Sequence, residues 1–165
     1  MFGERIKRAR VKSGLSLENL AVKANNIVTK QAISQYEKNQ KSPSSAVLIA
    51  LSEALDVGMD YFFRKVSVEI GEVDFRKHSS FGKKQQEMLK ENVKEELERY
   101  LELEQILNLE DTFVNPLESF QINSLDDIEE AVEQLRDKWN LGLNAISNIM
   151  QMLELRDIKI IYKYE

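Results

Sequence analysis

The stretch Ser16-Leu-Glu-Asn-Leu-Ala21, with the corner Asn25-Asn26-Ile-Val28 and the run Thr29-Lys-Gln-Ala-Ile-Ser-Gln-Tyr-Glu37, decides the fold of the first part of the chain. Ser16 and Thr29 are favoured helix N-caps, because their hydroxyls accept a hydrogen bond from a free backbone N–H of the first turn. Asparagine tolerates the positive φ that a tight corner requires. The stretch therefore predicts two short helices joined by a corner.

The second of these helices, predicted over Lys30 to Lys38, has two different faces. At about 100° per residue, one arc is mostly apolar and turned inward, and it comprises Ala32, Ile33, Tyr36 and Glu37. The other arc is polar and comprises Lys30, Gln31, Ser34, Gln35 and Lys38. Glutamine amides bond bidentately to adenine in the major groove, and lysines bond phosphate or guanine oxygens. The polar arc therefore predicts a helix that reads double-stranded DNA.

Roles within the predicted DNA-binding surface follow from these side chains. Gln31 and Gln35 are the expected base readers, and Ser34 supports them. Thr29 is the expected N-cap of this helix and is included in the predicted DNA-binding surface. The expected positioning residues, which hold the DNA backbone, are Lys30, Lys38, Asn39, Gln40 and Lys41.

Four ordered segments resemble the phage-repressor-like (Xre, Cro/CI) helix-turn-helix family over about residues 1–64. They are Gly3-Glu-Arg-Ile-Lys-Arg-Ala-Arg10, Gly14-Leu-Ser-Leu-Glu-Asn-Leu-Ala21, Ala32-Ile-Ser-Gln-Tyr-Glu37 and Pro43-Ser44. The resemblance implies a five-helix lambda-repressor-like domain with a partly buried ion pair between Arg10 and Glu37. Two features depart from the family: Leu17 stands where a phosphate-steadying Gln is usual, and the corner is about two residues longer.

The other helices of this domain are predicted from their own signals. A first helix spans about Phe2 to Lys12, with Ile6 and Ala9 inward, and Gly14 ends it. A fourth helix spans about Ser45 to Leu55, with its apolar residues at helical spacing. A short fifth helix follows Gly58, and its run Tyr61-Phe62-Phe63 is expected to close the core or to meet a partner chain.

Charge is distributed unevenly along the 165 residues. The net charge is -5, but residues 1–65 hold 11 Lys or Arg and 6 Asp or Glu, which makes this part basic by five charges. A basic head on an acidic body is compatible with nucleic-acid binding by the head alone. There is no cysteine, no apolar run of membrane-spanning length and no signal peptide at the start, so a cytoplasmic protein without membrane association is expected.

Residues 65–82 are predicted to connect the head to a second, mostly helical domain over residues 83–165. Val66 to Ile70 and Glu72 to Arg76 alternate apolar and polar residues, which favours short strands. The longest helix is predicted over Lys83 to Leu107, with an apolar stripe that indicates either a dimerisation helix or a core helix. Its glutamates Glu91, Glu95, Glu98 and Glu102 are interpreted as a solvated acidic face.

Two further helices and a terminal strand complete this second domain. One helix runs from Ser124 to about Asn140, with five residues expected inward: Ile128, Ala131, Val132, Leu135 and Trp139. Another is capped by Asn144. The final run from Ile158 to Tyr164 is typical of a strand.

The second part of the chain resembles the region before the catalytic core of repressor-fused ImmA/IrrE-type metallopeptidases. The resemblance rests on Phe75-Arg76-Lys77, Glu98-Arg-Tyr-Leu-Glu-Leu-Glu104, Ala131…Leu135-Arg136…Trp139-Asn-Leu-Gly142 and Met152-Leu-Glu-Leu…Ile158-Lys-Ile-Ile161. In that family a His-Glu-x-x-His helix follows, but this chain lacks one. A zinc site of that type needs two His on one helix face. The chain has one histidine, His78, so we expect no metal site, no cofactor and no enzymatic activity.

Two hypotheses of function remain. The first is a transcriptional repressor that binds DNA as a homodimer. The second is an interaction protein, either antitoxin-like or the non-catalytic regulatory part of a longer peptidase-repressor system continuing past Glu165. The strand-like end motivates the second hypothesis, because such a segment usually pairs with another strand or a protein partner.

Overall fold

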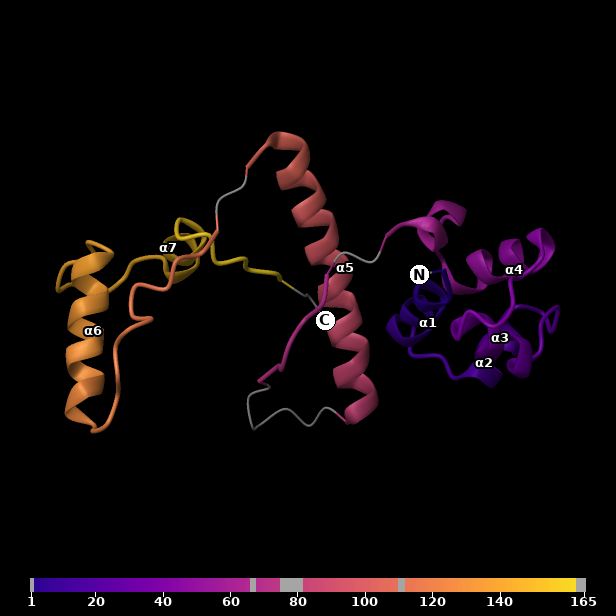
Figure 1. The fold of residues 1–165 in the computed structure, drawn as a ribbon, viewed down its shortest axis with the longest axis horizontal. Helices are drawn as coiled ribbons and strands as arrows, with labels where there is room; N and C mark the ends of the chain where they lie inside the picture. The colour runs from indigo at the N-terminus through magenta and orange to yellow at the C-terminus, as the bar shows by residue number, and fades with distance from the viewer. Residues whose placement is uncertain (1, 66–67, 75–81, 110–111, 163–165) are drawn as a thin grey trace. The chain divides into compact units, whose positions relative to one another are not determined.

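The computed structural model describes residues 2–65, 68–74, 82–109 and 112–162, and within them the chain is mainly helical (Figure 1). Its elements are α1 (Phe2–Lys12), α2 (Leu17–Lys23), α3 (Lys30–Glu37), α4 (Ser45–Leu55), the 3-10 helix η1 (Met59–Phe63), α5 (Lys83–Leu107), α6 (Asp126–Lys138) and α7 (Ile149–Glu154). None of the described helices is long and apolar enough to span a membrane.

The chain divides into two compact units, Met1–Leu103 and Glu104–Glu165. The boundary falls inside α5, so most of this helix belongs to the same unit as α1 to α4. The sequence instead placed the whole of Lys83–Leu107 in the C-terminal domain. This difference matters, because it makes α5 an extension of the head.

Local signals begin and end the helices of the head as the sequence predicts. The hydroxyls of Ser16 and Thr29 accept hydrogen bonds from the backbone N–H groups of Asn19 and Ala32 at 3.0 and 3.2 Å. Gly14 has a φ of +65° after α1, where a left-handed residue ends the helix. The corner between α2 and α3 contains two successive left-handed residues, Asn25 and Asn26, with φ of 52° and 54°. The longer corner is therefore formed without glycine.

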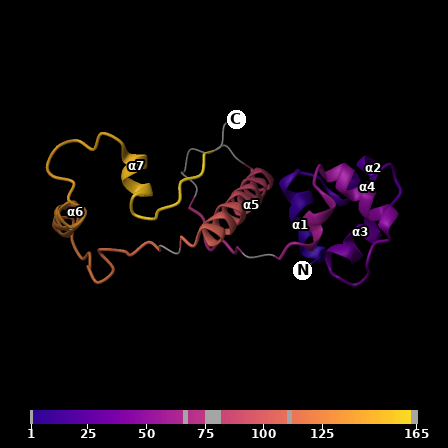
Figure 2. The same ribbon diagram turned by 90° about the horizontal axis from the view of Figure 1, so that it is seen from above.

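A single hydrophobic core joins these helices. Its fully buried side chains include Ile6 of α1, Leu20 of α2, Ile33 of α3, Leu51 of α4 and Phe62 of η1. Figure 2 shows α1, α2, α3 and α4 close together. Ile6 and Ala9, the predicted inward residues of α1, are buried, and Leu48, Leu51 and Leu55 of α4 are buried at the helical spacing that its sequence shows.

The fifth element of the head differs from the predicted helix. It is a 3-10 helix rather than an α-helix. Tyr61 and Phe62 are buried and close the core, whereas Phe63 is 69% exposed and its ring lies 5.6 Å from that of Phe2.

None of the predicted strands forms in the described residues. Residues 68–74 and 158–162 run without strand hydrogen bonding; positions 66, 67, 75, 76, 163 and 164 of the same predictions lie outside the described residues. Alternating apolar and polar residues favour a strand only where a neighbouring strand accepts its backbone hydrogen bonds. Neither segment finds such a neighbour among the residues that the structure describes.

The second unit, described over residues 104–109 and 112–162, is held mostly by polar bonds. Arg156 donates to the backbone oxygen of Trp139 at 2.7 Å and lies over its ring, and Lys159 bonds Glu104 at 2.6 Å. α7 is capped by Asn148 rather than by Asn144. Of the five residues predicted inward from α6, Ala131 is buried, Leu135 and Trp139 are half-buried, and Ile128 and Val132 are exposed.

α5 lies beside α1 in both views of the ribbon (Figures 1 and 2), and carboxylates of α5 pair there with cations of α1. Glu98 binds both Arg5 and Arg8 at 2.7 Å, Glu91 binds Arg8 at 2.8 Å, and Glu95 binds Lys12 at 2.7 Å. The interpretation of Glu91, Glu95 and Glu98 as solvated is therefore wrong. The physical reason is that α1 presents cations at the spacing at which α5 presents carboxylates.

Burial makes this contact sensitive to charge. Burial alone would raise the pKa of Glu98, but the hydrogen bonds and charges of Arg5 and Arg8 outweigh it and hold that pKa below its ordinary value. Burial likewise acts to lower the pKa of Arg8, and the carboxylates of Glu98 and Glu91 reverse the direction and raise it. Each partner is therefore held in its charged form by the other.

Acid should weaken this contact. Because the pKa of Glu98 is depressed in the folded state, its stabilisation is complete above the ordinary value of 4.5 and is lost as the pH falls through the folded pKa. Urea unfolding of the wild type and of Glu98→Gln should therefore differ at pH 7 and converge in acid. Glu102→Gln is the control, since Glu102 lies exposed one turn further along α5 and should show little difference at either pH. If wild type and Glu98→Gln differ in the free energy of unfolding as much in strong acid as at pH 7, the charge of Glu98 is not what stabilises the contact.

Candidate nucleic-acid interface

Helix α3 has the two faces that its sequence predicts. Ile33 is fully buried, and Ala32 and Tyr36 are half-buried against the core. On the other side Lys30 and Gln31 are exposed. Ser34 and Gln35 are half-buried there, and Lys38, just after the helix, is again exposed. The exposed Gln31 amide and the flanking ammonium groups can therefore reach a groove without a rearrangement of the head.

The residues after α3 continue this polar surface. Lys38 is the C-cap of the helix, and Asn39, Gln40 and Lys41 follow it, all exposed. Before the helix, the Thr29 hydroxyl caps the backbone of Ala32. The nine residues predicted from the sequence thus lie on and immediately beside α3.

Asn39 has a structural bond that the sequence does not indicate. Its side-chain oxygen accepts a hydrogen bond from the backbone N–H of Gly3 at 2.8 Å, and its backbone is left-handed with a φ of 55°. A Cβ at Gly3 would lie 2.1 Å from the backbone oxygen of Tyr36, so only glycine permits this approach. The beginning of α1 therefore holds the end of α3, and the Asn39 oxygen is already used for that purpose.

A second contact between α1 and α3 is the ion pair of Arg10 and Glu37. The guanidinium donates to the two carboxylate oxygens through Nε at 2.6 Å and Nη2 at 2.9 Å, and Nη1 donates to the Leu15 backbone oxygen at 2.9 Å. Both side chains are mostly buried, with 15% and 9% exposure. This two-pronged geometry fixes the orientation of both side chains, and with it the rotation of α3 against α1.

An acidic residue that the sequence does not single out also lies at the interface. The carboxylate of Glu18, in the first turn of α2, forms an ion pair with the ammonium group of Lys30. Both side chains are about half or more exposed, so solvent screens the pair. The pair reduces the local charge available to a phosphate at Lys30. No sequence signal reports it, because the two residues meet only through the packing of α2 on α3.

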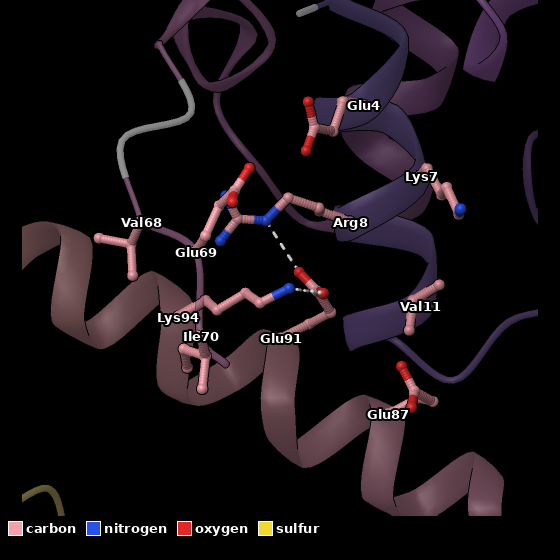
Figure 3. A pocket seen from close by; sticks show the side chains of 10 residues that line it. All are labelled: Glu4, Lys7, Arg8, Val11, Val68, Glu69, Ile70, Glu87, Glu91 and Lys94. Atoms are coloured by element: carbon pink, nitrogen blue, oxygen red, sulfur yellow. Dashed lines mark hydrogen bonds and ion pairs between the residues drawn. The ribbon is translucent and has the colours of Figure 1, made fainter. Parts of the chain in front are cut away.

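The basic residues Arg5, Arg8 and Lys12 are unavailable to DNA in this structure, because α5 pairs with them. Figure 3 shows Arg8 and Lys94 meeting Glu91 beside a cavity of about 400 Å³ between α1, α5 and the segment Val68–Ile70. Four glutamates and three cations line this cavity together with three apolar residues, and its lining includes no residue of α3. The cavity is therefore separate from the polar face of α3.

No group of three or more metal-binding side chains occurs among the residues that the structure describes. His78 lies outside those residues. Glu91, Glu95 and Glu98, which share one face of α5, are each bonded to an arginine or lysine.

Comparison with known proteins identifies the head as a helix-turn-helix domain. Residues 6–62 match the Helix-turn-helix family. A 69-residue stretch is 35% identical to the uncharacterised HTH-type transcriptional regulator YqaE of Bacillus subtilis (strain 168), and it makes up 42% of this chain and 58% of that protein. No solved structure matches the chain significantly. The family match ends at residue 62, so the resemblance of the second part to ImmA/IrrE-type proteins stays a prediction.

The Arg10–Glu37 pair should contribute measurably to stability. Replacing Arg10 by Met, or Glu37 by Leu, leaves the other charge mostly buried and unpaired, which should lower the free energy of unfolding by about 3 kcal/mol. Urea denaturation measures this loss. The double replacement should cost less than the sum of the two, because it leaves no unpaired charge.

The exposed pair of Arg64 and Asp60 provides a matched control. Arg64→Met should change the free energy of unfolding by no more than ~1 kcal/mol. If Arg10→Met changes it as little as Arg64→Met does, the ion pair has no role in holding α3.

Proposed function

We propose that the protein is a sequence-specific DNA-binding transcriptional regulator that reads the major groove with α3. The observation that supports this most directly is the position of α3: its apolar side is buried in the head and its polar side is exposed. The match of residues 6–62 to the Helix-turn-helix family and the similarity to an HTH-type transcriptional regulator support the same function.

The proposed base contacts come from Gln31 and Gln35, with Ser34 in support. A glutamine amide presents a donor and an acceptor together, which matches the N6 and N7 edge of adenine. Gln31 is exposed and lies in the first turn of α3, the part of a recognition helix that usually contacts base edges. Gln31 is therefore the residue on which the proposed specificity depends most.

The proposed backbone contacts come from residues around the ends of α3. Lys38 and Lys41 form no ion pair with any described carboxylate, so their ammonium groups are available to phosphates. Gln40 and the backbone at the end of α3 lie beside them. Lys30 contributes less, because Glu18 already neutralises it.

Repression is the outcome that we propose for DNA binding. A protein that occupies a site excludes other proteins from it, and this requires no further contact. A homodimer would place two copies of α3 ~34 Å apart, so the proposed operator is a pair of half-sites about one helical turn apart. Such a regulator acts where the chromosome is, which for a bacterial protein like its relative is the cytoplasm. We propose no enzymatic activity.

The second candidate function is a protein-interaction module formed by residues 104–165. Its described part buries few apolar side chains, since Leu125, Leu143 and Leu155 are all at least 70% exposed. Exposed apolar side chains in such number favour a protein partner. The two functions are compatible in one chain, because the first belongs to the head.

Replacing Gln31 by Ala tests the base contact. A binding selection against random duplexes, run at two salt concentrations, identifies the operator first. Gln31→Ala should then lose about 1–3 kcal/mol of discrimination at one base pair, with unchanged affinity for random DNA. Fluorescence anisotropy on the operator and on single-base variants measures this. Equal losses on operator and random DNA would exclude base reading by Gln31.

Replacing the lysines tests the backbone contacts. Lys38→Ala and Lys41→Ala should weaken binding to all sequences alike and reduce the slope of log K against log salt by about 1 each. Lys30→Ala should change the slope less, because Glu18 already pairs with it. Glu18→Gln should steepen the slope by freeing Lys30. If Lys30→Ala and Lys38→Ala have equal effects on the slope, the Glu18 pair is absent in solution.

A further inference from the structure

We propose that α5 pairs in antiparallel orientation with α5 of a second copy of this chain, through an apolar stripe on the side turned away from α1. The stripe consists of Leu89, Val93, Leu97, Tyr100 and Leu101. At about 100° per residue, its centre lies roughly opposite the face of Glu91, Glu95 and Glu98 that binds α1. Pairing through the stripe therefore leaves every contact between α1 and α5 in place.

The amphipathicity of α5 is inverted relative to an ordinary surface helix. Such a helix buries its apolar face and exposes its charges. In α5 the carboxylate face is the one packed on the head, and Glu95 is 7% exposed. On the stripe, Tyr100 is 48% and Leu101 is 39% exposed, and Leu89, Val93 and Leu97 are half-buried. A contiguous apolar face of this kind marks an interaction surface.

The spacing of the stripe fits another helix. Val93, Leu97 and Tyr100 follow one another by four and three residues, which is the repeat that keeps a seam facing a partner helix. An α5 from a second copy presents the same repeat. A symmetric pair therefore supplies both sides of the seam with complementary side chains.

The charges along α5 select the direction of pairing. Apart from Glu91, Glu95 and Glu98, which are bound to α1, the half from Lys83 to Lys94 holds four lysines and one glutamate, and the half from Glu96 to Leu107 holds three glutamates and one arginine. Parallel pairing would set like-charged halves side by side. Antiparallel pairing sets the basic half of one helix against the acidic half of its partner, which favours this direction.

A twofold axis near Leu97 then relates the two copies. Leu97 meets its counterpart, and Val93 of one copy meets Leu101 of the other. Each head stays on the outer side of the helix pair. The use of this dimer for reading two half-sites rests on the proposed function, but the pairing itself is tested without DNA, so failure of one is distinguishable from failure of the other.

Cysteine crosslinking tests both the surface and the direction, because the native chain contains no cysteine. A disulfide requires Cα atoms within about 7 Å. The full chain carrying Leu97→Cys should therefore form a covalent dimer under mild oxidation, at least ~10-fold more than Leu103→Cys, whose exposed side chain lies on the same helix but off the stripe. A mixture of Val93→Cys and Leu101→Cys should crosslink more than Val93→Cys alone.

Sedimentation equilibrium supplies the second measurement. The wild type should be dimeric, and Leu97→Glu should be monomeric while its circular dichroism and urea unfolding show a folded head. Gln31→Ala should dimerise as the wild type does. A monomeric wild type would overturn the proposal, and so would stronger crosslinking of Val93→Cys with itself, which indicates parallel helices. Equal crosslinking of Leu97→Cys and Leu103→Cys would overturn it as well. So would the finding that another protein, or residues 104–165 of the same chain, binds the stripe.

Discussion

The ion pairs made by the basic residues of α1 organise the first unit of this structure. At about 100° per residue, Gly3 and Arg10 lie on one side of α1, and Arg5, Arg8 and Lys12 lie on roughly the opposite side. The first side binds the end of α3 through Asn39 and Glu37, and the second binds α5 through Glu91, Glu95 and Glu98. One short helix thus fixes both α3 and α5, the longest of the described helices. Because buried charges are costly when unpaired, each of these contacts specifies a single arrangement.

The head could be predicted closely from its sequence because its signals are local. Caps such as Ser16 and Thr29, the left-handed Gly14 and the asparagine corner each act within a few residues, and the helix bounds follow from them. The spacing of the apolar residues in α4 also predicts which side of that helix faces the core. The polar face of α3 follows from the same periodicity. Its role in binding DNA, which the polar arc suggests and the resemblance to a helix-turn-helix family supports, remains a proposal.

The contact between α1 and α5 could not be read from either helix alone. Glutamates at helical spacing, such as Glu91, Glu95 and Glu98, usually face solvent, and nothing in α5 itself says otherwise. A signal does exist in the pair of helices: Arg5, Arg8 and Lys12 repeat with the same spacing of three and four residues. One sequence allows many such pairings between distant helices and does not show which of them forms. The same holds for the bonds of Asn39 with Gly3 and of Glu18 with Lys30. The predicted strands fail for the opposite reason. The alternation of apolar and polar residues is a local signal, but a strand forms only where another segment accepts its backbone hydrogen bonds.

These ion pairs also reduce the positive charge of the head that is available to a ligand. Residues 1–65 are basic by five charges in sequence, yet Arg5, Arg8, Arg10 and Lys12 are all bonded to carboxylates, and Lys30 is bonded to Glu18. Five of the 11 lysines and arginines of this part therefore hold helices together, and three of these five pair with carboxylates of α5, outside residues 1–65. For the proposed DNA binding, the lysines beside α3 that no described carboxylate pairs with are Lys38 and Lys41, at the end of the helix. On the proposed function, few such contacts would make the nonspecific affinity modest and the salt dependence shallow, so a useful affinity for DNA would have to come from the proposed base contacts of α3 and from the proposed pairing of two copies.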